Sequence, residues 1–320
     1  MLEAKYGETF AILRKAVRPV LVSHPNPDGD TLGSALGMWH ALKVVGVQAR
    51  LFCVSEVPRQ YWFMKGADAY MSSFRMFEDA DVVCTFDAGD LIFAGIQEGL
   101  QGFRGVLLNI DHHYTNKRFG QVNVVNVEAS STAEVVYSMV RCERVGLTRD
   151  MATCLLTGIL TDTSGLSNPG TTTGAFAAVA ELVRAGAKVQ EVHSRLVRNI
   201  SVPAMRVWGH ALSRLKYDVG LRLAGTAIFE DDLTELGLDS ESVAGVSNFL
   251  SRNLIAESIM VLREEGEMVR GSLRTVLGGD VSAVAAQLGG GGHRKAAGFA
   301  VEGELVERET YWGVERVRVQ

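Results

Sequence analysis

The first 130 residues alternate short apolar segments with longer stretches of helical periodicity, and this alternation most constrains the fold. The apolar segments have the length and β-branched content of buried strands: 18–23, 48–54, 81–87, 105–111 and 121–127. Parallel strands need long crossover connections, which are usually helices. The sequence therefore predicts an α/β fold, with a parallel, doubly wound sheet that carries helices on both faces.

The character of the chain changes towards its C-terminal third. Helical patterns dominate from about residue 131, whereas strand-like segments return after about residue 218, with a hairpin expected at Glu265–Gly266. This change indicates a second, smaller α+β domain. The predicted division is a first domain over 1–190, a helical linker over 191–218 and a second domain over 219–320.

Composition excludes several classes of protein. The chain has 320 residues, of which 47% are hydrophobic and 22% charged, and its net charge is −5. These values are ordinary for a globular protein of two domains and argue against binding to long duplex nucleic acid. Its segments are too short to span a membrane, and its four cysteines show no C-x-x-C spacing. We therefore expect a cytoplasmic protein with free thiols and no membrane partner.

Acidic and imidazole side chains gather at the ends of the predicted strands. They are His24, Asp28 and Asp30 after 18–23, Asp87 at the end of 81–87, Asp111, His112 and His113 at the end of 105–111, and Asp162 after a helical segment. An aspartate in such a turn is often a helix cap. However, the carboxyl ends of parallel strands share one edge of a sheet, so together these residues predict one site.

A cluster of carboxylates repels itself unless cations neutralise it. Oxygen ligands with some imidazole suit Mn²⁺, with Mg²⁺ or Co²⁺ as alternatives. There are enough candidate ligands for two cations, and we expect Asp28 and Asp30 to bind different ones. Two cations roughly 3.5–4 Å apart can activate a water and hold the oxygens of a phosphorus centre. The pattern thus indicates hydrolysis of a phosphate ester.

Four of these motifs, in order, resemble those of the DHH phosphoesterase superfamily: HPNPDGD (24–30), Asp87, DHH (111–113) and TDT (161–163). GGGGHRKAAG (289–298), preceded by GSLRT (271–275), resembles the DHHA1 substrate-binding domain. The resemblance implies a parallel-sheet DHH domain followed by a smaller α+β DHHA1 domain. Within the superfamily the chain is similar to the NrnA-type nano-RNases, which degrade oligoribonucleotides and dephosphorylate pAp (adenosine 3′,5′-bisphosphate).

The resemblance also implies roles for individual residues. One cation would be held by His24, Asp28 and Asp87, and the other by Asp30, Asp87, His112 and Asp162, with Asp87 bridging them. The catalytic residues would be Asp87, His113, which faces the substrate, and Asp111, which orients a histidine. Ser164 departs from the family pattern, where glycine is common.

The glycine run of the second domain predicts a substrate site. Backbone at Gly290, Gly291 and Gly292 can approach an anion closely and offer N–H groups to it. His293 and Arg294 would add positive charge there, and Arg274 could clamp a phosphate with its guanidinium group. We expect these six residues to bind a terminal phosphate or nucleotide.

The leading hypothesis is a two-metal phosphoesterase that cleaves short oligoribonucleotides from an end to mononucleotides and converts pAp to AMP and phosphate. One alternative is a phosphodiesterase of cyclic dinucleotides or their linear products, such as pApA. The other is a nucleotide-binding regulator with a dead site, which the loss of a ligand would mark. The expected partners are short RNA, pAp or a dinucleotide, and the apolar helical faces favour a homodimer.

Overall fold

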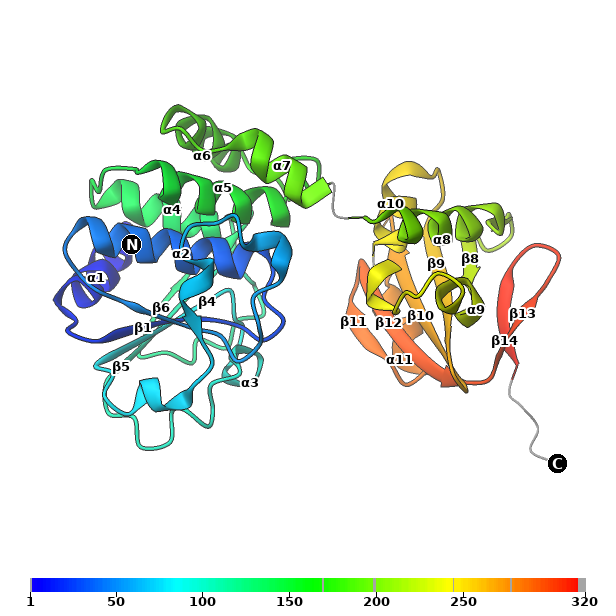
Figure 1. The fold of residues 1–320 in the computed structure, drawn as a ribbon, viewed down its shortest axis with the longest axis horizontal. Helices are drawn as coiled ribbons and strands as arrows, with labels where there is room; N and C mark the ends of the chain where they lie inside the picture. The colour runs from blue at the N-terminus through cyan, green and yellow to red at the C-terminus, as the bar shows by residue number, and fades with distance from the viewer. Residues whose placement is uncertain (1, 169, 198–199, 244, 277, 316–320) are drawn as a thin grey trace. The chain divides into compact units, whose positions relative to one another are not determined.

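The computed structural model describes residues 2–168, 170–197, 200–243, 245–276 and 278–315 (Figure 1). It divides the chain into two compact units, Met1–Asn199 and Ile200–Gln320. The division falls within the stretch that was predicted as a linker. One helix of that stretch, α8 (Val202–Ser213), packs buried side chains, among them Val207 and Trp208, into the core of the second unit.

The first unit contains a six-stranded sheet in the order β3-β2-β1-β4-β5-β6, and all neighbouring strands are parallel. The strands are β1 (Pro19–Ser23), β2 (Arg50–Phe52), β3 (Tyr70–Met71), β4 (Val82–Phe86), β5 (Val106–Asp111) and β6 (Val122–Val125). Each predicted segment contains one of these strands, and the predicted parallel sheet is confirmed. The two-residue β3 was not predicted, because it is too short to show a periodicity.

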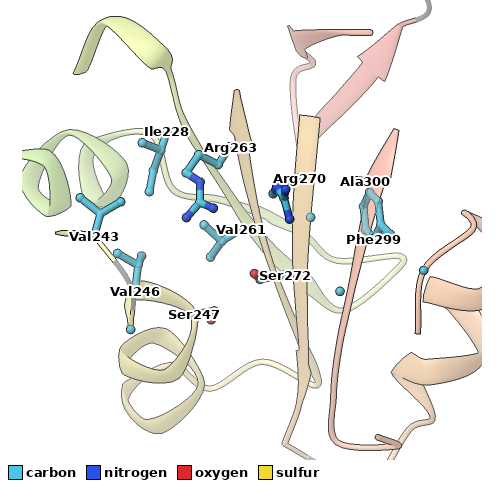
Figure 2. Close-up of a pocket in the computed structure, with 14 residues that line it drawn as sticks. Ile228, Val243, Val246, Ser247, Val261, Arg263, Arg270, Ser272, Phe299 and Ala300 are labelled. Carbon is cyan, nitrogen blue, oxygen red and sulfur yellow. The ribbon is translucent and has the colours of Figure 1, made fainter. Parts of the chain in front are cut away.

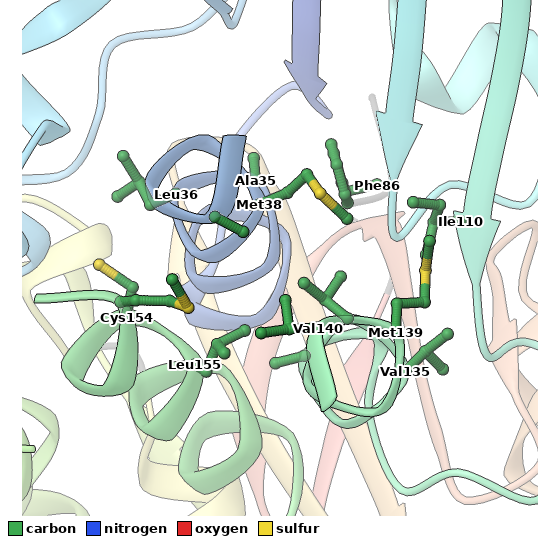
Figure 3. Close-up of a cluster of buried hydrophobic side chains, with 14 of the residues drawn as sticks. Ala35, Leu36, Met38, Phe86, Ile110, Val135, Met139, Val140, Cys154 and Leu155 are labelled. Carbon is green, nitrogen blue, oxygen red and sulfur yellow. The ribbon is translucent and has the colours of Figure 1, made fainter. Parts of the chain in front are cut away.

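The long helices of this unit lie on one side of the sheet (Figure 1). They are α1 (Leu2–Lys15), α2 (Gly29–Val44), α4 (Thr132–Cys142), α5 (Arg149–Asp162), α6 (Thr173–Arg184) and α7 (Val189–Val197). Helices α2 and α4 cover the strands, with Met38, Val135 and Met139 near Phe86 and Ile110, and α5 packs against both helices (Figure 3). This apolar layer holds α2, α4 and α5 together over one face of the sheet.

Short segments cover the other face, where helices were also expected. They are α3 (Leu91–Ala94) and the 3₁₀ turn η3 (Phe74–Phe77), which both supply buried side chains to the core on this face. The turns η1 (Arg59–Tyr61) and η2 (Ala67–Ala69) instead place Tyr61 and Ala67 in the core that the long helices form. The connections from β2 to β4 and from β4 to β5 contain these short segments in place of a long crossover helix. Helical segments therefore flank both faces, but unequally.

Glycines allow α2 and α5 to approach closely. A Cβ atom on Gly33 would lie 2.5 Å from the Cys154 carbonyl oxygen and 2.8 Å from the Gly158 nitrogen. One turn further, a Cβ on Gly37 would lie 2.4 Å from the Leu155 Cδ2 atom. Backbone atoms cannot move aside as a side chain can, so larger residues at Gly33 would separate the two helices.

We predict that Gly33→Ala lowers the free energy of unfolding by about 1–3 kcal/mol, because the added methyl group meets backbone atoms of α5. Gly7→Ala is the matched control, since its Cβ would meet the end of the flexible Glu143 side chain at 3.2 Å within helix α1. This control should be neutral or slightly stabilising, as alanine favours helices. Urea denaturation measures both variants, and equal effects would contradict the close packing of α2 on α5.

The second unit contains a mixed six-stranded sheet in the order β11-β12-β10-β9-β8-β7. Its strands are β7 (Lys216–Asp218), β8 (Leu223–Ile228), β9 (Ser258–Glu265), β10 (Met268–Thr275), β11 (Gly291–His293) and β12 (Ala296–Glu302), and β13 (Glu304–Glu307) pairs with β14 (Trp312–Glu315). Its other helical segments are α9 (Glu230–Thr234), η4 (Glu241–Val243), α10 (Val246–Asn253) and α11 (Val281–Gln287). The smaller α+β unit and its β9–β10 hairpin are confirmed.

Within the described residues, we find no helix with both the length and the apolar character needed to cross a bilayer.

Candidate active site

Three neighbouring strands carry the predicted site residues to one edge of the first sheet. His24 follows β1, Asp87 follows β4 and Asp111 ends β5, and these strands are adjacent and parallel. The chain leaves β1 for β2 on one side, while β4 pairs with β1 on the other side. Side chains at the carboxyl ends of strands around such a reversal of strand order commonly form the ligand site of an α/β fold.

Asp87 occupies the centre of this edge and is 5% exposed. Its Oδ2 atom lies 3.7 Å from His24 Nε2, and its Oδ1 atom lies 3.8 Å from His112 Nε2 and 3.5 Å from His113 Nδ1. The Thr132 hydroxyl donates a hydrogen bond of 2.9 Å to Oδ1. Asp87 has a backbone φ of +57°, which is rare for a residue other than glycine and marks a position held by its surroundings.

The structure brings all six predicted metal ligands together in overlapping groups. The ligand atoms within each group lie within 4.8 Å of one another, and the groups are His24–Asp28–Asp87, Asp30–His112–Asp162 and Asp87–His112–His113. Asp87 belongs to two groups and so does His112. The arrangement offers more than one place for a cation, with Asp87 shared between places.

Both histidines are oriented as metal ligands usually are. His24 Nδ1 lies 2.8 Å from the Pro25 carbonyl oxygen, and His112 Nδ1 lies 3.2 Å from the Ala129 carbonyl oxygen. A proton on each Nδ1 would leave the Nε2 lone pair facing the carboxylates. His112 Nε2 is buried, lacks a hydrogen-bond partner in the described part of the chain and lies 3.4 Å from Asp162 Oδ2. A bound cation would satisfy this atom.

The carboxylates also fit a cation electrostatically. Burial, to which the nearby charge of Asp87 adds, raises the pKa of Asp28, Asp30 and Asp162, in the last case to about 6. Burial also acts to raise the pKa of Asp87, but the neighbouring imidazoles outweigh it and lower that pKa. A divalent cation would relieve the repulsion, so the donor set fits hard or borderline divalent cations.

Two helix N-termini hold the acidic side chains in place. Asp28 caps α2 by accepting hydrogen bonds of 3.0 and 3.1 Å from the Asp30 and Thr31 amides. Asp30 accepts bonds of 2.7 and 2.9 Å from the Thr132 and Ala133 amides, which begin α4. Asp28 is therefore the cap of α2, whereas Asp30, for which a cap of its own helix was the ordinary interpretation, accepts from the start of a different helix. These bonds supply part of the positive charge that the site needs.

Asp111 lies behind the histidines and is fully buried. Its Oδ1 atom accepts hydrogen bonds of 2.8 Å from His113 Nδ1 and from the His112 amide. The bond between Asp111 and His113 Nδ1 raises the pKa of His113, against the effect of burial, to about 9. The His113 side chain is 41% exposed, so a substrate can reach it. This geometry suits a positioning role for Asp111.

Sequence analysis missed two residues of the site, Thr132 and Asn116. Asn116 Nδ2 donates to Asp111 Oδ2 at 2.5 Å and to Asn109 Oδ1 at 2.8 Å, which fixes the orientation of Asp111. No periodicity marks an asparagine in a loop, and its proximity to the DHH motif was the available signal.

Thr132 is the first residue of α4 and follows the residue that caps this helix, Ser131. The Ser131 hydroxyl does accept a bond of 3.0 Å from the Glu134 amide, as a cap should. The Glu134 carboxylate, however, accepts from the backbone and side chain of Ser130, so Ser131 and Glu134 do not form a reciprocal capping box. The next residue, Thr132, directs both its amide and its hydroxyl to site aspartates.

The second unit has a pocket of about 430 Å³ on one face of its sheet. Arg263 of β9 and Arg270 of β10 are paired across the hairpin, and Figure 2 shows them beside each other near Ser272. Both guanidinium groups also contact Glu265. The size of the pocket suits a nucleotide-sized ligand, and its arginines favour an anion. Sequence analysis missed both arginines, which the register of the predicted hairpin would have placed opposite each other.

Of the predicted substrate residues whose side chains the structure describes, one lines this pocket. Gly290 lines it, and Arg274 lies on the same face of β10 as Arg270, with its Nε atom 2.8 Å from Asn248 Oδ1. Arg294 is exposed, with its Nε atom 3.5 Å from Asp280 Oδ2. The side chain of His293 lies outside the described residues.

The glycine run serves the sheet directly. Gly291 and Gly292 belong to β11, which pairs with β12. A Cβ on Gly290 would lie 2.1 Å from the Gly298 carbonyl oxygen, and one on Gly292 would lie 2.6 Å from the Ala296 carbonyl oxygen. Close approach of two backbones therefore requires glycine here, whether or not an anion binds.

Comparison with known proteins agrees with this geometry. Residues 19–159 match the model of the DHH family, N-terminal domain, and residues 224–309 match the DHHA1 domain. The chain is 31% identical to the bifunctional oligoribonuclease and PAP phosphatase NrnA of Thermus thermophilus. The 308 aligned residues cover 94% of this chain and 91% of that protein. The chain belongs to the DHH phosphoesterase family.

This DHH protein is also similar to a second sequence relative and to a solved structure. A probable manganese-dependent inorganic pyrophosphatase of Streptococcus thermophilus is 25% identical over 178 residues, which cover 52% of this chain and 56% of that protein. The crystal structure of an exopolyphosphatase-related protein from Bacteroides fragilis has a TM-score of 0.87 at 24% identity, over 94% of this chain and 92% of that chain. The second comparison concerns the fold alone.

The family's common glycine after the TDT motif has a structural explanation in this DHH protein. Ser164 has a backbone φ of +54°, in the left-handed region that glycine adopts without strain. The departure at this position therefore affects backbone strain and leaves the ligand set intact.

We predict that Mn²⁺ affinity weakens as pH falls through about 6. Asp162 has its pKa raised to about 6, so it carries a proton below that pH, and a protonated carboxyl group does not ligate. By calorimetry, affinity at pH 5 should be at least about tenfold weaker than at pH 7.5 from this group alone. Asp162→Asn should bind more weakly at pH 7.5 and depend less on pH. Equal affinity of the unaltered protein at both pH values would contradict the assignment.

Proposed function

We propose that this protein is a metal-dependent phosphoesterase that releases mononucleotides from an end of short oligoribonucleotides and converts pAp to AMP and phosphate. The observation that carries the proposal is the pair of potential cation sites sharing buried Asp87, with the unpartnered His112 Nε2 between carboxylates. The named activities of the Thermus relative, which aligns along nearly the whole chain, supply the substrate class.

Two divalent cations, most simply Mn²⁺, would be held by the six predicted ligands. His24, Asp28 and Asp87 would hold one cation, and Asp30, His112 and Asp162 the other. Asp87 would reach the second cation through its Oδ1 atom, which lies 3.8 Å from His112 Nε2. Such ions lower the pKa of a bound water and stabilise charge on phosphate oxygens. Mn²⁺ is supported by the ligand chemistry and by the similarity to a probable manganese-dependent pyrophosphatase.

His113 supplies the proton that the leaving oxygen needs. Asp111 holds its Nδ1–H, and the raised pKa keeps the imidazole protonated at neutral pH. General acids act best when they are protonated at the working pH and reach the substrate, and the half-exposed His113 meets both conditions. Asp111 and Asn116 keep the ring in one orientation.

The second unit would hold the end of the substrate. Its arginine-lined pocket accepts one nucleotide by volume, and Arg274 lies on the same sheet face. A site that holds an end favours short chains, because each additional nucleotide gains little without further basic contacts. The four free cysteines suit a reducing compartment, so we place the reaction in the cytoplasm.

The test is turnover of pAp, pApA, cyclic di-AMP and RNA of 5 and 24 nucleotides with Mn²⁺, in unaltered protein and in Asp87→Asn. We expect kcat/KM to fall with length and the products to be mononucleotides. Asp87→Asn should keep less than about a tenth of the rate while remaining folded, because both cation sites lose a ligand. Glu78→Gln, at an exposed position, is the control and should be fully active.

Each contrary result has a distinct meaning. A rate that rises steadily with RNA length would contradict the end-holding site. Preferential opening of cyclic di-AMP would favour a cyclic-dinucleotide phosphodiesterase. Binding without turnover of any substrate would indicate a regulator with a dead site.

A further inference from the structure

An exposed aromatic ring adjoins the proposed active site. The Phe93 ring, on α3, has its centroid 4.8 Å from that of the His24 imidazole at an interplanar angle of 44°, yet the residue is 54% exposed. Its neighbour Ile92 is 70% exposed. Large apolar side chains next to a cluster of carboxylates do not stabilise that cluster, and their exposure shows that they do not belong to the core.

The structure holds the short helix that carries this ring in place at both ends. Asp90 begins α3 and accepts a hydrogen bond of 2.8 Å from the Phe93 amide, and Lys117 donates to the same carboxylate at 2.9 Å. At the other end of α3, Gly95 has a φ of +69°, and a Cβ there would lie 2.5 Å from the Pro25 Cγ atom. Because Pro25 follows His24, this contact fixes α3 directly against the metal-ligand loop.

An exposed ring on a fixed helix, beside a proposed phosphate site, suits one kind of ligand. Every nucleobase has a flat π face, and stacking on an aromatic side chain is a general way to hold a single strand. The base of a nucleotide lies within one nucleotide's length of its own 5′-phosphate. A ring in contact with a predicted ligand of the phosphate-binding cations is therefore close enough to meet that base.

We propose that Phe93 is a stacking subsite for the base of the nucleotide that follows the scissile phosphate. This inference rests on the proposed function, in which the terminal nucleotide is held by the second unit. In pApA the scissile phosphate links the terminal nucleotide to a second one, whose base would stack on Phe93. In pAp the corresponding 3′-phosphate carries no second nucleotide, so the subsite stays empty.

Comparing kcat/KM on pApA with kcat/KM on pAp gives the test an internal control. Phe93→Ala should lower kcat/KM for pApA by roughly tenfold or more, the usual effect of losing one stacked base, and should change that for pAp by less than about twofold. Phe93→Leu keeps an apolar cover on His24 but removes the ring, so it should show the same selective loss. Phe93→Trp should retain activity on both substrates. Mn²⁺ affinity, measured by calorimetry, should be the same in all four proteins.

Other outcomes overturn the inference. Equal losses on pAp and pApA would mean that the ring serves His24 and not a base. Full activity of Phe93→Leu on pApA would mean that apolar cover suffices. If the unaltered protein hydrolyses neither substrate, the proposed function fails and this inference with it, whereas unaffected variants of an active enzyme refute this inference alone.

Discussion

The buried carboxylate of Asp87 is the constraint on which the rest of the site depends. It follows β4 with a left-handed backbone, lies among three imidazoles and accepts a hydrogen bond from Thr132. A carboxylate buried in this way is costly unless positive charge compensates it. The imidazoles lower its pKa, and further carboxylates on α2 and α5 create a demand for cations. The whole edge of the sheet is organised around satisfying that charge.

Helix packing sets the geometry of these groups. Gly33 lets α2 approach α5, and a Cβ on Gly158 of α5 would lie 2.9 Å from Asp30 Oδ1. Asp30 in turn binds the first amides of α4. Three helices thus meet around one carboxylate, and a change in their separation would move the ligands. A change in core packing would therefore also change the positions of the ligands in the site.

The sequence predicted what local patterns encode. Buried strands with ligands at their carboxyl ends gave both the parallel sheet and the residues that the structure gathers around Asp87. It did not predict the partners that depend on tertiary contacts, such as Asn116 and Thr132, because neither residue has a distinctive neighbour pattern. Gly290 and Gly292 have packing reasons that a sequence cannot separate from anion binding, so their role in substrate binding stays a prediction. The unequal covering of the sheet likewise depends on connection lengths that periodicity does not resolve.

The central claim is that this chain holds two cations that share Asp87. Anomalous diffraction from crystals grown with Mn²⁺ tests it most directly, because the peaks locate the metal independently of any activity. The account predicts two peaks, one beside His24 and Asp28 and one beside His112 and Asp162, with Asp87 coordinating both. A single peak, or two peaks of which Asp87 touches only one, would contradict it.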